Sequence, residues 1–171
     1  MKRLSLFAVA LALFAAGCSK SSTSPSTTPT KPTFTAALST ANEVPPITNA
    51  EAGASGNATI TFDLTKDAAG NVTAGTATFV VNLSGFPAGT PINIAHIHTG
   101  AAGTTGAVLV STTLAAGEVV LATGSGSFTK TAPILPVDAN NIINNPAGFY
   151  FNAHSALNGG GVVRGQLVKV S

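Results

Sequence analysis

The sequence predicts an all-β domain, an antiparallel Greek-key sandwich or barrel of about eight strands. Three observations predict it. Several short segments alternate apolar and polar residues, which is the period of a half-buried strand. Gly, Pro and Asn separate these segments, as turn residues do. Finally, 44% of the residues are hydrophobic and only 8% are charged. We expect the folded domain to span residues 33–171, a length that can bury a core of its own.

The N-terminus has the pattern of an export signal. Lys2 and Arg3 precede an apolar run over residues 4–14, and the small residues of "AAGC" end at Cys18. That run is shorter than the ~20 residues that cross a bilayer. The "AAGC" end resembles a bacterial lipobox, which implies a lipoprotein signal peptide over residues 1–17 and lipidation of Cys18. Ordinary secretion with cleavage nearby is the alternative.

Residues 18–32 contain Ser, Thr and Pro and no large apolar side chain. Such a segment buries too little surface to order itself, so we expect a flexible tether. Several acyl chains on Cys18 would hold the protein on a membrane. Ser19 after the cysteine resembles the outer-membrane sorting pattern of lipoproteins. The expected location is therefore the cell envelope, with the lipid anchor as the membrane partner and the protein partner unknown.

The clearest strand prediction is a hairpin. In "ATITFDLT", residues 58–65, Ala58, Ile60, Phe62 and Leu64 share one face. In "TATFVVNL", residues 76–83, every second residue is again apolar, from Ala77 to Leu83. The polar stretch "KDAAGNVT" between them is typical of a turn. A short helical turn is expected over residues 136–146. Six further strands are expected, at residues 34–39, 93–98, 106–114, 125–130, 148–154 and 163–170.

The segment "INIAHIHTG", residues 92–100, contains two of the three histidines of the chain. On a strand His96 and His98 share a face, together with Ile92 and Ile94, about 6.6–7 Å apart along the strand. In "FYFNAHS", His154 would share a face with Tyr150 and Asn152, opposite a buried face of Phe149, Phe151 and Ala153. If the two strands lie close together, three imidazoles form an open copper or zinc site. The alternatives are histidines that hydrogen-bond backbone groups and order the next loop, or a surface without a role.

Charge is rare enough in this chain to make Glu43 and Arg164 notable. Glu43 precedes two prolines, which favour an extended chain, and Arg164 lies on a terminal strand. One hypothesis is a buried, bidentate ion pair that joins the two segments. The alternative is two separate surface charges.

The charge balance argues against nucleic-acid binding. The eight basic residues include Lys2 and Arg3 of the export signal, which leaves six basic against six acidic residues. A nucleic-acid-binding domain needs a clustered basic surface instead. The sequence also contains no arrangement of a nucleophile with a base, and no paired carboxylates for acid–base catalysis. We therefore expect a binding or structural module rather than an enzyme.

Three motifs together resemble the CHRD domain, which is named after chordin and occurs in bacterial secreted proteins. They are "EVPP" at residues 43–46, "AHIHTGAAGTTG" at residues 95–106, and "YFNAH" followed by "RGQ" at residues 150–166. The motifs occur in the family's order and span about residues 33–169. Ala107 and Val163 depart from the residues that are common in the family. The resemblance implies a β-sandwich fold and an extracellular location, and attaches no catalytic activity.

A second resemblance concerns the fold. "GFPAGTPINIAHIHTG" is similar to the H-x-H strand of Cu/Zn superoxide dismutase, a Greek-key barrel. That family holds two metals with more histidines and an aspartate than this chain offers. Dismutase activity is therefore not expected, and a single copper site in a similar barrel remains one hypothesis. The others are an envelope or adhesion module with structural histidines and, third, a metal-dependent redox enzyme.

Overall fold

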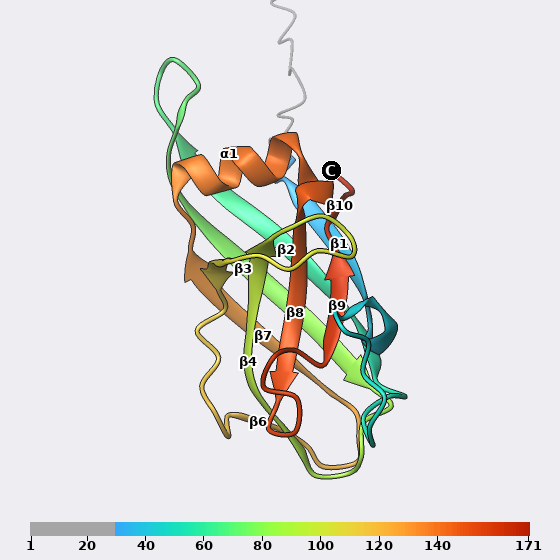
Figure 1. The fold of residues 1–171 in the computed structure, drawn as a ribbon. Coiled ribbons are helices and arrows are strands. Elements are labelled where there is room, and N and C mark those ends of the chain that lie inside the picture. The colour runs from blue at the N-terminus through green and yellow to red at the C-terminus, as the bar shows by residue number, and fades with distance from the viewer. Residues whose placement is uncertain (1–29) are drawn as a thin grey trace, which may run out of the picture.

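The computed structural model describes residues 30–171, which form one antiparallel sheet that curls into a nearly closed barrel (Figure 1). Eight strands follow the order β5-β4-β8-β9-β1-β2-β3-β7, while β10 pairs with β1 and β6 pairs with β4. The predicted all-β fold is confirmed. The strands are β1 (Thr33–Ser39), β2 (Ser55–Lys66), β3 (Val72–Ser84), β4 (Thr90–Thr99), β5 (Val108–Ser111), β6 (Val119–Leu121), β7 (Gly126–Pro133), β8 (Phe149–Ser155), β9 (Val163–Gln166) and β10 (Val168–Lys169).

Helical structure is short in the described part of the chain. The helix α1 (Pro136–Asn144) begins at a proline, which suits the first helical turn because its missing N–H has no partner there. In Figure 1 it lies across one end of the barrel. Its residues fall within the segment 136–146, for which the sequence predicted a helical turn. Two 3-10 turns, η1 (Thr40–Asn42) and η2 (Pro146–Gly148), follow β1 and precede β8. Within residues 30–171, none of the helical segments is long and apolar enough to cross a bilayer.

The hairpin of β2 and β3 supplies much of the core, as the alternation predicted. The two strands pair antiparallel, with Ile60 opposite Phe79 and Phe62 opposite Ala77. These four side chains are fully buried, and Val81 is buried beside them. The polar side chains between them point outward. One face of the hairpin therefore forms the wall of the barrel interior.

Two predicted strands have different bounds from those expected. The segment 106–114 contains only the four residues of β5, and the segment 163–170 divides into β9 and β10 at Leu167. Leu167 is buried, and its N–H donates to the carbonyl oxygen of Phe149. The three-residue strand β6 was not predicted. Such short pairings depend on the neighbouring strand β4 rather than on a local pattern.

The structure corrects one prediction about β4. The register with β8 shifts between Ile92 and Ile94, and this bulge places two residues of β4 against one of its partner. Ile92 is therefore buried in the core, whereas Ile94 is 42% exposed. His96 and His98 share their face with Ile94 and not with Ile92. The bulge turns the second half of β4 so that its histidines lie outside the apolar core.

The N-terminal predictions fall mostly outside the described residues. The signal peptide over residues 1–17, Cys18 and all of the tether except its last three residues belong to that part. Of those three, Lys31 forms an ion pair with Asp63, and the carbonyl oxygen of Pro32 accepts a hydrogen bond from Phe62 N–H. The first strand then begins at Thr33, which pairs with Thr61.

Candidate metal centre

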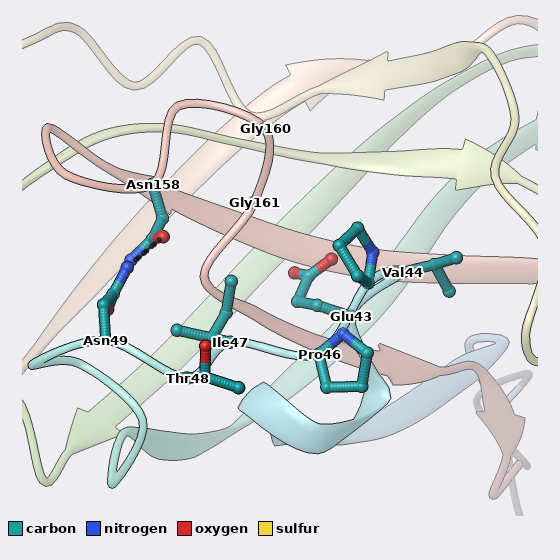
Figure 2. Close-up of a pocket in the computed structure, with 10 residues that line it drawn as sticks. Glu43, Val44, Pro46, Ile47, Thr48, Asn49, Asn158, Gly160 and Gly161 are labelled. Atoms are coloured by element: carbon teal, nitrogen blue, oxygen red, sulfur yellow. Dashed lines mark hydrogen bonds between the residues drawn. The ribbon is translucent and has the colours of Figure 1, made fainter.

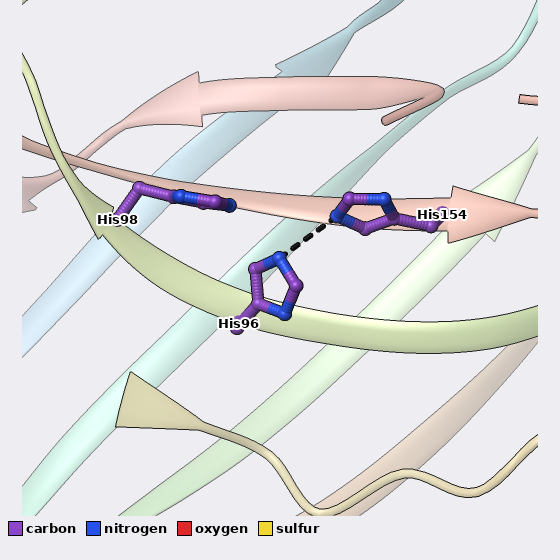
Figure 3. A group of neighbouring side chains, drawn as sticks. All are labelled: His96, His98 and His154. Atoms are coloured by element: carbon purple, nitrogen blue, oxygen red, sulfur yellow. Dashed lines mark hydrogen bonds between the residues drawn. The ribbon is translucent and has the colours of Figure 1, made fainter. Parts of the chain in front are cut away.

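The pairing of β4 with β8 brings the three histidines together. His96 lies opposite Asn152 and His98 lies opposite Tyr150, so that His154 is the diagonal neighbour of His96. One nitrogen of each imidazole lies within 4.8 Å of a nitrogen of the other two. Figure 3 shows the rings of His98 and His154 pointing toward each other along the strands, with His96 below the gap between them. The predicted grouping of His96, His98 and His154 is therefore present.

The site lies outside the apolar core but away from water. His96 and His154 are 6% and 5% exposed, and His98 is partly buried. Phe149, Phe151 and Ala153 of β8 point to the opposite face and into the core, as the sequence predicted. β8 is therefore buried on both faces, with apolar side chains on one and polar side chains on the other.

Backbone carbonyls determine which nitrogen of two rings carries the proton. His98 Nδ1 lies 2.9 Å from the carbonyl oxygen of Gly106, and His154 Nδ1 lies 2.9 Å from that of Gly159. A carbonyl only accepts hydrogen bonds, so both Nδ1 atoms carry a hydrogen. In the neutral ring the Nε2 atom then has a free lone pair. Both Nε2 lone pairs are thus available at the centre of the group.

Burial keeps the imidazoles of His96 and His154 neutral. Burial, together with the repulsion that the charges of His154 and His98 would exert, lowers the pKa of His96 to about 3. The pKa of His154 is also lowered, mainly by burial, although the hydrogen bond to Gly159 opposes this. At neutral pH, His96 and His154 therefore present lone pairs rather than positive charge.

The centre of the histidine group has more hydrogen-bond acceptors than donors. His154 Nε2 lies 2.9 Å from His96 Nε2 and 3.1 Å from Asn152 Oδ1. The Asn152 side chain also interacts with the Glu43 carboxylate, whose pKa it lowers. His98 Nε2 is buried without any hydrogen-bond partner. Only the Nε2 hydrogen of His96 remains to serve these acceptors.

The outer side of the site is a stack of three planar groups. The Tyr150 ring lies parallel to the His98 ring, with centroids 4.7 Å apart and planes at 9°. The guanidinium carbon of Arg164 lies 3.4 Å from the centroid of the Tyr150 ring. Arg164 also donates to the carbonyl oxygen of Ala101 and to Gln166 Oε1. The stack fixes the plane of the His98 ring and connects it to the loop that follows β4.

The predicted ion pair between Glu43 and Arg164 is not formed. Both residues are buried, at 7% and 1% exposure, but the ion pairs within residues 30–171 are Lys31–Asp63 and Lys130–Glu118. The guanidinium is held by Tyr150 and the loop carbonyl instead. Burial raises the pKa of Glu43 to about 7, and the nearby charge of Arg164 only partly opposes this. Arg164 therefore affects the pKa of Glu43 without forming an ion pair with it.

Glycines beside the site allow the close approach of backbone and side chain. At Gly106 a β-carbon would lie 1.8 Å from the Thr99 carbonyl oxygen, so only glycine lets its own carbonyl reach His98. At Gly161, where φ is +128°, a β-carbon would lie 2.7 Å from both Asn152 Nδ2 and Glu43 Oε1. Glycine at both positions is therefore required for the hydrogen-bond geometry around the histidines.

Sequence reasoning did not assign roles to Asn152 and Tyr150. It placed both on the face of His154, which is where they lie, and the two-residue spacing of "YFNAH" was the available signal. Their functions depend on which strand lies beside β8. That pairing joins segments more than fifty residues apart in the chain and has no local signature.

The fold and the site define an antiparallel barrel with a three-histidine group on two adjacent strands. The family model of the CHRD domain matches residues 34–167, and the chain belongs to this family. No curated protein and no solved structure matches the chain. The similarity of the H-x-H strand to Cu/Zn superoxide dismutase therefore stays a prediction from the sequence.

Proposed function

We propose that this CHRD domain binds one copper or zinc ion through the Nε2 atoms of His96, His98 and His154. The observation that carries the proposal is His98 Nε2, a buried acceptor without a partner that faces two further imidazoles. A buried acceptor without a donor is costly. A metal ion would accept the Nε2 lone pairs of His98 and His154, and also that of His96 once the His96 proton moves from Nε2 to Nδ1.

The donor set fits these two metals. Neutral imidazole suits both zinc and copper, and three such ligands leave an open position for water or another ligand. Carbonyl oxygens on the far nitrogens of His98 and His154 correspond to the outer hydrogen bonds that orient metal-binding histidines. Copper is favoured over zinc because nitrogen ligands bind it more tightly.

The geometry requires only small ring movements. Metal–nitrogen bonds of ~2.0–2.1 Å at tetrahedral angles separate ligand nitrogens by ~3.3–3.4 Å. The His96 and His154 Nε2 atoms are 2.9 Å apart, and all three ligand atoms lie within 4.8 Å of one another. On metal binding, the distance between the Nε2 atoms of His96 and His154 would increase slightly, and the longer nitrogen–nitrogen distances in the group would decrease.

The experiment is a calorimetric titration of the untagged protein, stripped of metal, with Cu²⁺ and with Zn²⁺. We expect one ion per chain and at least a hundredfold weaker binding in His98→Ala and in His154→Ala. Ile94→Ala is the matched control, because Ile94 lies on the same face opposite His154 without offering a ligand. Equal binding by all four proteins would refute the proposed site.

A structural role for the histidines is the second candidate. The observation that favours it is the direct contact between His96 Nε2 and His154 Nε2, which is short enough for one hydrogen bond. In this case the domain is an envelope or adhesion module. The titration would then show no saturable binding, while His96→Ala and His154→Ala would lower the melting temperature.

We further propose that Cys18 anchors the chain in the outer membrane of the cell envelope. The support is the sequence pattern of residues 1–18 and the polar segment that follows it. Labelled palmitate should be incorporated into the wild-type protein and not into Cys18→Ser, and the wild type should sediment with outer membranes. Recovery of unlabelled wild-type protein in the soluble fraction would contradict the anchor.

A further inference from the structure

Within residues 30–171, two buried side-chain polar atoms have no hydrogen-bond partner, and one of them belongs to Glu43. Its Oε1 atom has none, and the other such atom is His98 Nε2. The residue is 7% exposed. A carboxylate oxygen buried without a donor loses the hydrogen bonds that water gave it, so its position needs an explanation.

The nearest cation does not provide the missing contact. Arg164 lies close enough to affect the pKa of Glu43, but its guanidinium is stacked on Tyr150 and donates to Ala101 and Gln166. The Asn152 side chain lowers the pKa of Glu43, but Oε1 has no hydrogen-bond partner. No side chain of residues 30–171 therefore neutralises Glu43 by direct contact.

Glu43 forms part of a pocket of about 290 Å³ between the segment after η1 and the loop between β8 and β9. Figure 2 shows the carboxylate pointing toward the Gly160–Gly161 backbone, with Pro46 and Ile47 along one side and Asn158 at the far end. Glu43 and Gly161 are buried, whereas Pro45, Pro46 and Gly160 around them are exposed. The carboxylate thus lies at the base of a small surface pocket whose walls are about half polar and half apolar, with Pro45, Pro46 and Ile47 in the apolar part.

The charge of this pocket is negative above pH 7, where Glu43 is ionised. Glu43 is the only charged residue that lines it. Asn158, which also lines it, donates to the buried carboxylate of Glu51 behind the wall. Arg164 lines a neighbouring pocket, which Glu43 also lines, and does not line this one. The volume lies at the lower end of the range for ligand sites, which suits a small group.

We propose that this pocket binds a primary alkylammonium group, whose nitrogen donates to the Glu43 carboxylate at its base while its carbon chain packs against Pro45, Pro46 and Ile47. A compact ammonium supplies the missing donor and the missing positive charge together. The alkyl stem matches the apolar part of the walls. The same chemistry is offered by a free small amine and by a lysine side chain of another molecule.

The test is an NMR titration of the full-length, ¹⁵N-labelled protein in EDTA at pH 8, above the raised pKa of Glu43. The probes are n-butylammonium, the neutral n-butanol, and the peptide acetyl-Gly-Lys-Gly-amide. We expect saturable shifts of the Gly160 and Gly161 amide signals with n-butylammonium and not with n-butanol. Tighter binding of the peptide would assign the group to a lysine side chain, and weaker binding to a free amine.

Three variants make the result specific. Glu43→Gln should weaken n-butylammonium binding at least tenfold. Gly160→Val should narrow the pocket with Glu43 intact, since Gly160 lines the pocket and a β-carbon there meets no atom within 4 Å. Gly159→Val is its matched control, with equally open surroundings but outside the pocket lining. It should bind as the wild type does.

The outcomes separate this proposal from the metal site. His98→Ala should keep full n-butylammonium binding, because the pocket does not use that ring. Shifts that do not saturate, or equal binding by the wild type and Glu43→Gln, would overturn the proposal. So would equal effects of Gly160→Val and Gly159→Val. Loss of metal binding in the titration described above would leave this result unaffected.

Discussion

Tyr150 and His98 lie face to face across the β4–β8 pair, with ring planes 9° from parallel. The other face of Tyr150 is covered by the guanidinium of Arg164. The His98 ring is therefore held on one side by an aromatic stack and at Nδ1 by the Gly106 carbonyl. Its free nitrogen has one orientation available, toward His96 and His154.

Replacing Tyr150 tests whether this stack positions a metal ligand. Tyr150→Leu should weaken copper or zinc binding by about tenfold, because outer contacts of this kind typically contribute one to two orders of magnitude. Tyr150→Phe keeps the ring and should bind as the wild type does. Calorimetric titration measures both. Unchanged affinity in Tyr150→Leu would show that the Gly106 carbonyl alone orients His98.

Metal binding should stabilise the fold. An ion that binds only the folded state adds about 2.7 kcal/mol to the unfolding free energy at one hundred times its dissociation constant. The melting temperature should therefore rise on adding Zn²⁺ and return to its starting value with EDTA. His98→Ala should show no rise, and Ile94→Ala should show the full rise. A rise in His98→Ala as large as in the wild type would indicate binding elsewhere.

His96 should make the metal-free protein sensitive to acid. Its folded-state pKa is lowered to about 3 from 6.5, so its contribution to stability is complete above pH 6.5. As pH falls below 6.5, the unfolded chain takes up a proton that the folded ring refuses, and stability is lost. Between pH 7.5 and 4.5, urea denaturation should show the wild type losing about 1–3 kcal/mol relative to His96→Leu. Thr99→Val on the same strand should parallel the wild type.

Glu43 should have the opposite pH dependence. Its folded-state pKa is raised from 4.5 to about 7, so its contribution is complete below pH 4.5 and is lost as pH rises through 7. Glutamine imitates the protonated acid. Glu43→Gln should therefore gain about 1–3 kcal/mol relative to the wild type between pH 5 and pH 8 in urea denaturation.

A second carboxylate serves as the control for Glu43. The pKa of Glu118 is lowered, chiefly by the hydrogen bond from Lys130. Glu118→Gln should show no gain over the same pH interval, because its folded-state carboxylate is already ionised. Identical trends in the two variants would mean that burial of Glu43 does not govern its titration.

Gly161 should tolerate no side chain. Its φ of +128° is rarely adopted by other residues, and a β-carbon would collide with Asn152 and Glu43. Gly161→Ala should cost ~2–4 kcal/mol of stability. Gly159→Ala, whose β-carbon meets nothing within 4 Å, should lie within ~0.5 kcal/mol of the wild type. Thermal denaturation of both variants measures the difference.

Local patterns predicted the parts of the fold that depend on neighbouring residues. The alternation from Ala58 to Leu64 identified β2 because a period of two is written directly into the sequence. The bulge in β4 was missed, since an extra residue in one strand is visible only against its partner. Ile92 was therefore placed on the wrong face.

The candidate site was likewise predicted where the residues of one strand decide it. The spacing of His96 and His98 placed them together, and the alternation along "FYFNAHS" placed His154 with Tyr150 and Asn152. The partner of Arg164 was wrong because opposite charge suggested Glu43, whereas the guanidinium stacks on Tyr150 instead. Planar stacking between strands depends on register, which no single segment contains.

The neighbouring position of β4 and β8 has a consequence for biosynthesis. The third imidazole enters the chain 56 residues after His98. A partly synthesised or partly translocated chain therefore carries the paired donors of β4 without the one that completes the group. If the group binds a metal ion as proposed, the ion would be enclosed only after β8 has docked on β4, and it would come from the compartment where folding finishes rather than from the one where synthesis begins.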